Sequence, residues 1–215
     1  MPPRTPAPIP SHPAVEILED KRVWSGRFPL DVIRFRHRRF DGSPSQPHSW
    51  ELWRRGRAAA LVPYDPAADA VVLIEQFRFP ALAAGLDPVL VELPAGLCED
   101  GETPEATIRR EMREEMGLDA DRVEWAGHYI LSAGGTDETC DIFMGRVQAP
   151  PAGPDGIAGT GGVATENEDI RVRVWPAATA IDHALTGRFP NAITTIGLLW
   201  LAARRDWLRQ HWKTP

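Results

Sequence analysis

The chain has 215 residues, of which 43% are hydrophobic and 25% charged, an ordinary composition for one globular domain. Its formal net charge of −6 excludes a global positive field, so we expect neither nucleic acid nor a membrane as a partner. Two cysteines without CxxC spacing, no signal peptide and no run of eighteen apolar residues predict a cytoplasmic protein.

The first part of the chain predicts an extended start followed by strands. Residues 1–14 include six prolines and are predicted to be disordered or extended. From Val15, apolar residues alternate with polar ones in pieces separated by turn signals, which indicates a meander of β-strands. The predicted strands cover 14–24, 29–40, 49–55, 58–64 and 70–79.

The second predicted strand contains the basic run RFRHRR at residues 34–39. Basic residues interleaved with aromatic ones can bind nucleic acid, but the same alternation fits a solvated strand face. The acidic balance of the chain favours the solvated face. A contact between subunits is the other use that the pattern allows.

The second half of the chain mixes strands with helices. A Gly/Pro/Ala-rich run over 148–164 has the length of a functional or mobile loop. Apolar residues recur at helical spacing towards the end of the chain, which predicts two terminal helices. The predicted strands cover 123–131, 140–147 and 170–175, and these helices cover 176–187 and 191–212. The pattern favours an α+β fold with a sheet-rich body and three helices.

The third helix is predicted over residues 104–116, with a signal at each end. Thr103 is suited to cap the first turn, and Pro104 follows at the first helical position, where its missing N–H does no harm. Gly117 stands where a helix ends in the left-handed conformation.

One edge of this predicted helix is acidic. Glu111, Glu114 and Glu115 fall within about a third of its circumference, and a Gly-containing loop returns Glu102 towards the same place. The remaining residues sort into an apolar sector, Ile108, Met112 and Met116, and two arginines that point away, Arg109 and Arg113. A solvated helix with Glu–Arg pairs is the simpler interpretation of such a composition. Uncompensated carboxylates on one edge favour a Mg²⁺ site instead.

The same stretch matches a family motif. Residues 96–118 meet all nine fixed positions of the Nudix box, GX5EX7REUXEEXGU: Gly96, Glu102, Arg110, Glu111, Met112, Glu114, Glu115, Gly117 and Leu118. The chain therefore resembles a Nudix hydrolase, which implies an αβα sandwich around a mixed β-sheet and hydrolysis of a nucleoside diphosphate derivative with Mg²⁺ or Mn²⁺. Arg110 would hold the glutamates by ion pairing.

The resemblance extends from Val15 to about Trp212. The stretches RFPLDVIRFRHRRFDG, VELPAGLCEDGE, LSAGGTDE and ATENEDIRV look like the ADP-ribose pyrophosphatase branch. Members of that branch are homodimers with exchanged N-terminal strands. We therefore expect an antiparallel β-strand region over 15–56 that forms a dimer, followed by a Nudix domain over 57–215.

The branch also implies roles for individual residues. The metal ligands would be the backbone carbonyl of Ala95 and the carboxylates of Glu111, Glu114, Glu115 and Glu168. The general base would be Glu166, on the acidic loop TENED, with Glu115 and Arg110 completing the catalytic set. The expected substrate-binding residues are Arg78, which contacts the diphosphate, and Trp50, Glu51, Gly134, Gly135 and Glu138. Trp50 could stack on adenine or pack in a dimer interface.

The resemblance implies that a metal-activated water cleaves ADP-ribose to AMP and ribose 5-phosphate. Two residues depart from the branch: Ala133 replaces the proline of SPGG, and Trp50 stands where a close relative would carry arginine. These departures leave open a pyrophosphatase for another nucleotide sugar, such as GDP-mannose. A non-catalytic sensor that binds ADP-ribose is a further alternative, although such proteins tend to lose box glutamates, which this chain keeps.

Overall fold

The computed structural model describes residues 4–212. The chain divides into two compact units, one of Met1–Arg57 with Ile130–Thr139 and the other of Ala58–Tyr129 with Cys140–Pro215. The predicted disorder of residues 1–14 includes residues 1–3, which lie outside the described residues. Residues 4–14 hold no strand, and the N–H of Arg4 donates to the carbonyl of Arg27 at 3.1 Å. The disorder of this segment stays a prediction.

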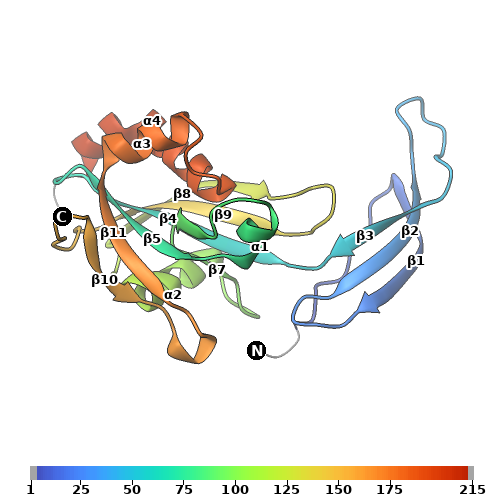
Figure 1. Ribbon diagram of the computed structural model, residues 1–215. Coiled ribbons are helices and arrows are strands. Elements are labelled where there is room, and N and C mark those ends of the chain that lie inside the picture. Colours follow the sequence, from blue (N-terminus) through green and yellow to red (C-terminus); the bar gives the residue numbers. More distant parts are fainter. Residues whose placement is uncertain (1–3, 213–215) are drawn as a thin grey trace. The chain divides into compact units, whose positions relative to one another are not determined.

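The first unit contains an antiparallel three-stranded sheet. Strands β1 (Val15–Trp24), β2 (Leu30–His37) and β3 (His48–Trp53) follow one another in the order β1-β2-β3 (Figure 1). The predicted N-terminal antiparallel strands are confirmed. The segment 130–139 joins this unit because the N–H of Trp53 donates to the carbonyl of Gly135 at 2.8 Å and Arg54 pairs with Asp137 at 2.6 Å.

The second unit is built on an eight-stranded sheet. Its main path runs in the order β10-β11-β5-β4-β9-β8, with β6 paired to β5 and β7 paired to β4. The strands are β4 (Arg57–Asp65), β5 (Ala70–Phe77), β6 (Val89–Glu92), β7 (Ala95–Leu97), β8 (Arg122–Ile130), β9 (Thr139–Arg146), β10 (Ile157–Gly161) and β11 (Ile170–Pro176).

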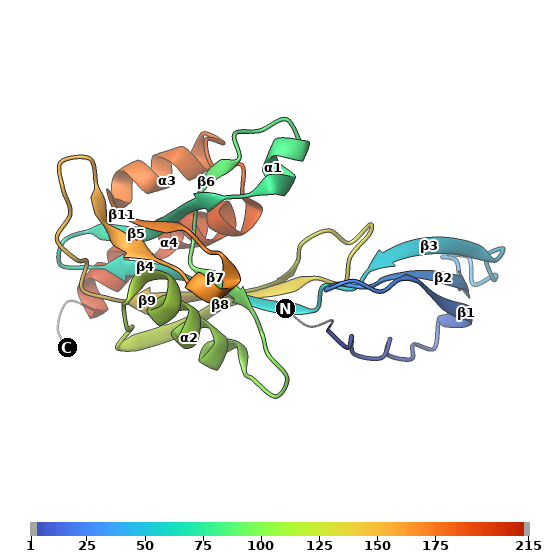
Figure 2. The ribbon, with the colours of Figure 1, turned by 60° about the horizontal axis from the view of Figure 1, so that its bottom comes forward.

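Helices cover both faces of this sheet. α2 (Pro104–Met116) lies on one face, and α3 (Ala177–Leu185) and α4 (Ala192–His211) lie on the other (Figures 1 and 2). The buried neighbours Leu61 and Val62 show why two cores form: Leu61 packs in the core under α2 and Val62 in the core under α3 and α4, since successive strand residues face opposite sides. The predicted α+β fold with an αβα sandwich is confirmed.

Some predicted element boundaries were wrong. The predicted loop over 148–164 contains β10, in which Gly159 and Gly161 weaken the preference for a strand. β5 ends at Phe77, and the short helix α1 (Phe79–Ala83) begins where a strand was expected to continue. Along the described residues, no helix is long and apolar enough to cross a membrane.

Candidate active site

α2 begins and ends at the residues that the sequence predicts. The side chain of Thr103 accepts a hydrogen bond from the N–H of Ala106 at 3.2 Å, and Gly117 ends the helix with a φ of 66°. Ile108 and Met112 are fully buried against the sheet. This packing fixes which edge of α2 faces the neighbouring segments.

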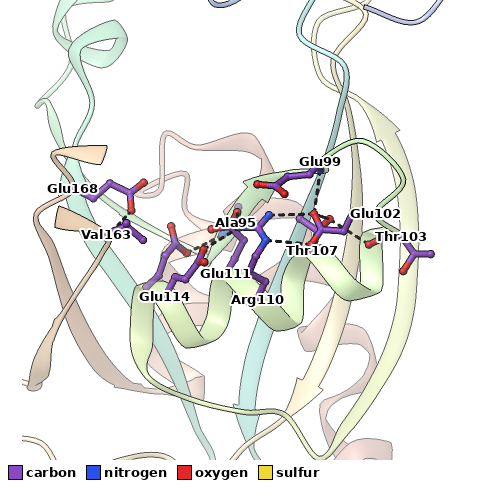
Figure 3. A network of polar contacts seen from close by, with 11 residues as sticks. Ala95, Glu99, Glu102, Thr103, Thr107, Arg110, Glu111, Glu114, Val163 and Glu168 are labelled. Atoms are coloured by element: carbon purple, nitrogen blue, oxygen red, sulfur yellow. Dashed lines mark hydrogen bonds and ion pairs between the residues drawn. The ribbon is translucent and has the colours of Figure 1, made fainter. Parts of the chain in front are cut away.

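Arg110 is the centre of an ion-pair network on this edge (Figure 3). Its Nε and Nη2 donate to the two carboxylate oxygens of Glu102, each at 3.1 Å. Its Nη1 donates to Glu111 Oε1 at 2.8 Å and to Glu114 Oε2 at 2.9 Å. The hydrogen bonds from Arg110, with help from the hydroxyl of Thr107, lower the pKa of Glu102 to about 2.

Glu111 is a partly buried carboxylate and Glu115 a buried one, and both have raised pKa values. Burial is the main cause that raises the pKa of Glu111 to about 7, against the opposing effect of Arg110. The Glu115 side chain accepts a hydrogen bond from the N–H of Ala95 at 3.1 Å, and the residue is 3% exposed. Burial, and then the charge of Glu111, raise the pKa of Glu115 well above its ordinary value.

Two glycines allow backbone to approach this edge closely. A Cβ on Gly96 would lie 1.7 Å from Glu111 Oε1, so a larger residue would push that carboxylate out of its present position. A Cβ on Gly161 would lie 1.9 Å from the carbonyl oxygen of Glu115. The strand β7 and the end of β10 therefore both pack directly against α2.

The segment after β10 brings a further carboxylate, that of Glu168, to the same place. The N–H of Gly162 donates to the carbonyl of Glu114 at 2.9 Å, and Glu168 accepts a hydrogen bond from the N–H of Val163 at 3.1 Å (Figure 3). The charge of Glu168 contributes to raising the pKa of both Glu111 and Glu115. Glu166 ends the 3-10 helix η1 (Ala164–Glu166), and its side chain lies outside what the structure describes.

The side chains at this edge offer the oxygen ligands that a hard divalent cation prefers. Among the described side chains, which exclude that of Glu166, no three His, Cys, Asp or Glu groups converge closely enough to hold a metal ion. The described carboxylates turn instead to protein donors: Glu111 to Arg110, Glu115 to Ala95 and Glu168 to Val163. All the same, they supply only oxygen ligands, and their burial and mutual repulsion are what a bound cation would offset.

Arg78 lies at the end of β5, next to this acidic site. Its Nε donates to Glu92 Oε2 at 2.7 Å, and its charge opposes the rise in the pKa of Glu115. Sequence reasoning missed Glu92, which also contacts Gln76 and Asn191. The only signal for it was a single carboxylate in the otherwise apolar run VLVEL.

The remaining predicted substrate-binding residues belong to the first unit. Trp50 is 55% exposed and its ring lies 5.6 Å from that of Phe35, with Glu51 beside it on β3. Arg55 donates to both carboxylate oxygens of Glu138, at 3.1 and 3.0 Å, and its guanidinium stacks on two aromatic rings. The predicted pair Gly134 and Gly135 lies in the turn of the segment 130–139.

The comparisons with known proteins agree with the sequence motif at residues 96–118 and with the αβα sandwich fold. The NUDIX domain family matches residues 54–191. The chain belongs to the Nudix family. It is 41% identical over 198 residues to the ADP-ribose pyrophosphatase of Escherichia coli (strain K12), with 92% of each chain covered. It is 33% identical over 191 residues to the GDP-mannose pyrophosphatase of Cronobacter sakazakii, covering 88% of this chain and 96% of that protein.

A solved structure supports the fold of this Nudix protein. The crystal structure of an ADP compounds hydrolase superposes with a TM-score of 0.66, covering 96% of this chain and 100% of the other. The two sequences are 19% identical. This likeness shows a shared fold.

Proposed function

We propose that the chain is a Nudix hydrolase that cleaves the diphosphate of ADP-ribose to AMP and ribose 5-phosphate, with Mg²⁺ or Mn²⁺ as cofactor. The observation that carries the proposal is the pair of the partly buried Glu111 and the buried Glu115 on one edge of α2, beside Ala95 and Glu168. The 41% identity with an ADP-ribose pyrophosphatase over 92% of both chains supports the choice of substrate.

The proposed metal-binding groups are the carbonyl of Ala95 and the carboxylates of Glu111, Glu114, Glu115 and Glu168. When bound there, a divalent cation would neutralise diphosphate charge and lower the pKa of a coordinated water. Arg110 restrains Glu111 and Glu114 through one nitrogen, which keeps both carboxylates on the same edge of the helix.

We propose further roles for residues outside α2. Glu166 would accept the proton of the attacking water, because it stands on the loop that also carries Glu168. Arg78 would bind the diphosphate through its guanidinium, which suits phosphate oxygens. The residues proposed to bind the rest of the nucleotide sugar are Trp50, Glu51, Gly134, Gly135 and Glu138.

We propose in addition that the protein is a cytoplasmic homodimer that exchanges its N-terminal strands. The first unit supports this proposal with large apolar side chains that the single chain leaves exposed: Val15, Ile17, Val23, Trp24, Trp50 and Trp53. Light scattering of the purified protein should give twice the chain's mass of 23.8 kDa. A monomer at micromolar concentration would contradict the dimer.

A substrate panel tests the proposed activity. Initial rates with Mg²⁺ are measured for ADP-ribose, other ADP-sugars, GDP-mannose, NADH and diadenosine polyphosphates. We expect the highest kcat/KM for ADP-ribose. The 33% identity with a GDP-mannose pyrophosphatase keeps GDP-mannose as the second candidate, and a preference for it would assign Ala133 and Trp50 to a changed pocket. Binding of ADP-ribose without hydrolysis of any substrate would indicate a sensor instead.

A further inference from the structure

Arg78 is held by one nitrogen and leaves two for a ligand. Its Nε donates to Glu92 at 2.7 Å, and within the described residues its terminal nitrogens make no hydrogen bond. The Arg78 side chain is 43% exposed, whereas the Glu92 side chain is 5% exposed. A guanidinium fixed at Nε presents its two terminal N–H₂ groups in a defined direction, which suits two oxygens of a phosphate group.

Glu92 is held in turn by two neutral donors from other segments. Gln76 Nε2, on β5, lies 3.4 Å from Glu92 Oε2, and Asn191 Nδ2, at the start of α4, donates to Glu92 Oε1. A carboxylate that is 96% removed from solvent needs such donors in place of water. Arg78, Gln76 and Asn191 together restrain both of its oxygens.

The side chain of Asn191 is itself fixed by α4. Its Oδ1 accepts the N–H of Thr194 at 3.0 Å and so caps the helix, which turns its Nδ2 towards Glu92. A second contact ties the same parts together, since the hydroxyl of Thr194 accepts the N–H of Leu93 at 3.1 Å. The first turn of α4 therefore sets the position of β6 and of Glu92.

The same short segment reaches the acidic edge of α2. Glu92 ends β6, and Ala95, three residues further, donates its N–H to Glu115 at 3.1 Å. We propose that Glu92 is a positioning residue, held by Asn191 and Gln76, that turns the terminal nitrogens of Arg78 towards the substrate diphosphate beside the α2 glutamates. This inference rests on the proposed function and adds to it a residue outside the Nudix box.

Glu92→Gln should disturb Arg78 without removing bulk. A glutamine has one accepting oxygen, and its N–H₂ group would face a donor, so it cannot hold Arg78 and Asn191 together. We expect kcat/KM for ADP-ribose to fall about tenfold. The loss should divide between a lower kcat and a higher KM in the same proportion as in Arg78→Ala. The matched control is Glu75→Gln, which removes the ion pairs of Glu75 with Arg171 and Arg173 by the same chemical change. Its kcat/KM should stay at the wild-type value.

A double-mutant cycle separates positioning from a general structural effect. If Glu92 acts through Arg78, the variant with both Glu92→Gln and Arg78→Ala should be no slower than Arg78→Ala alone. Losses that multiply, or an equal loss in Glu75→Gln, would overturn the proposal. Asn191→Ser provides a second test if Glu92→Gln fails to fold, because serine keeps the cap of α4 but removes the Nδ2 donor. We expect a loss of severalfold in kcat/KM, and an unchanged value would contradict the network.

The design distinguishes failure of this inference from failure of the proposed function. If the wild-type protein does not hydrolyse ADP-ribose, the proposed reaction is wrong. The double-mutant cycle is then measured with the Kd of ADP-ribose, determined by calorimetry in EDTA, in place of kcat/KM. Coupling between Glu92 and Arg78 in that Kd would still support the positioning role. Independent effects, or no binding of ADP-ribose at all, would overturn it.

Discussion

Gly161 packs so tightly against Glu115 that a Cβ at position 161 would lie 1.9 Å from the Glu115 carbonyl oxygen. This contact joins the end of β10 to α2, and the neighbouring Gly162 adds a hydrogen bond to the carbonyl of Glu114 at 2.9 Å. The segment that carries Glu168 is thereby attached to the helix that carries Glu111 and Glu115. A loop-like sequence thus has a fixed place beside the site.

Gly161→Ala should loosen that attachment. The added methyl group cannot fit against the backbone of α2, so we expect the free energy of unfolding to fall by about 1–3 kcal/mol. Turnover should fall as well, because Glu168 and Glu166 are displaced from α2. Urea unfolding and kcat measure the two effects. A variant with wild-type stability and turnover would show that this packing contributes to neither quantity.

Glu115→Gln should lose most of its turnover while staying folded. Glutamine keeps an oxygen for the N–H of Ala95 but removes the charge, and we expect kcat to fall by about 100-fold or more. Stability without metal should not fall, because burial and Glu111 disfavour the Glu115 charge. Glu105→Gln is the matched control on the same helix, since Glu105 is exposed and, among the described residues, its side chain pairs with Arg109 alone. Equal kcat values in the two variants would remove Glu115 from the mechanism.

Glu166→Gln should lose turnover with little change in the affinity for substrate. The proposed role of Glu166 is to accept a proton, which glutamine cannot do. Single-turnover rates and the Kd of ADP-ribose separate the two quantities. Asp169→Asn on the same acidic loop provides the control, because Asp169 is exposed. Turnover that survives in Glu166→Gln would assign the proton transfer to another group.

The ion pair of Glu102 with Arg110 should make stability depend on acid pH. Hydrogen bonds from Arg110 lower the pKa of Glu102 from its ordinary 4.5 to about 2, so below 4.5 the unfolded chain binds this proton more readily than the folded chain. The stabilisation is complete above 4.5 and is lost as the pH falls towards 2.

Urea unfolding of the wild-type protein and of Glu102→Gln checks this pH dependence. The difference in unfolding free energy should be constant from about pH 7 to about pH 5 and then shrink with falling pH. A difference that stays constant down to about pH 3 would show that the pKa of Glu102 is not lowered in the folded protein.

The sequence predicted α2 and its ends correctly because the signals are local. Thr103, Pro104 and Gly117 each act on the backbone of their own turn, and the apolar spacing of Ile108 and Met112 sets the buried face. The strand β10 was missed because two of the five residues in IAGTG are glycines, which disfavour strands, and its pairing with the next strand, β11, leaves no signal in its own sequence.

The candidate site was predictable where a motif marked it and not elsewhere. The box identified the carboxylates, but it did not show that the guanidinium of Arg110 contacts Glu111 and Glu114 through one nitrogen. The contacts of Glu92 were not predictable, since its partner Asn191 lies 99 residues away and only the fold brings the two together.

The products formed from ADP-ribose with and without a divalent metal test the central claim most directly. The purified protein is incubated with ADP-ribose and Mg²⁺, and the products are separated by ion-exchange chromatography. The account predicts AMP and ribose 5-phosphate in equal amounts, no products in EDTA, and recovery when Mg²⁺ is restored. Unchanged product formation in EDTA, or no cleavage with either Mg²⁺ or Mn²⁺, would contradict it.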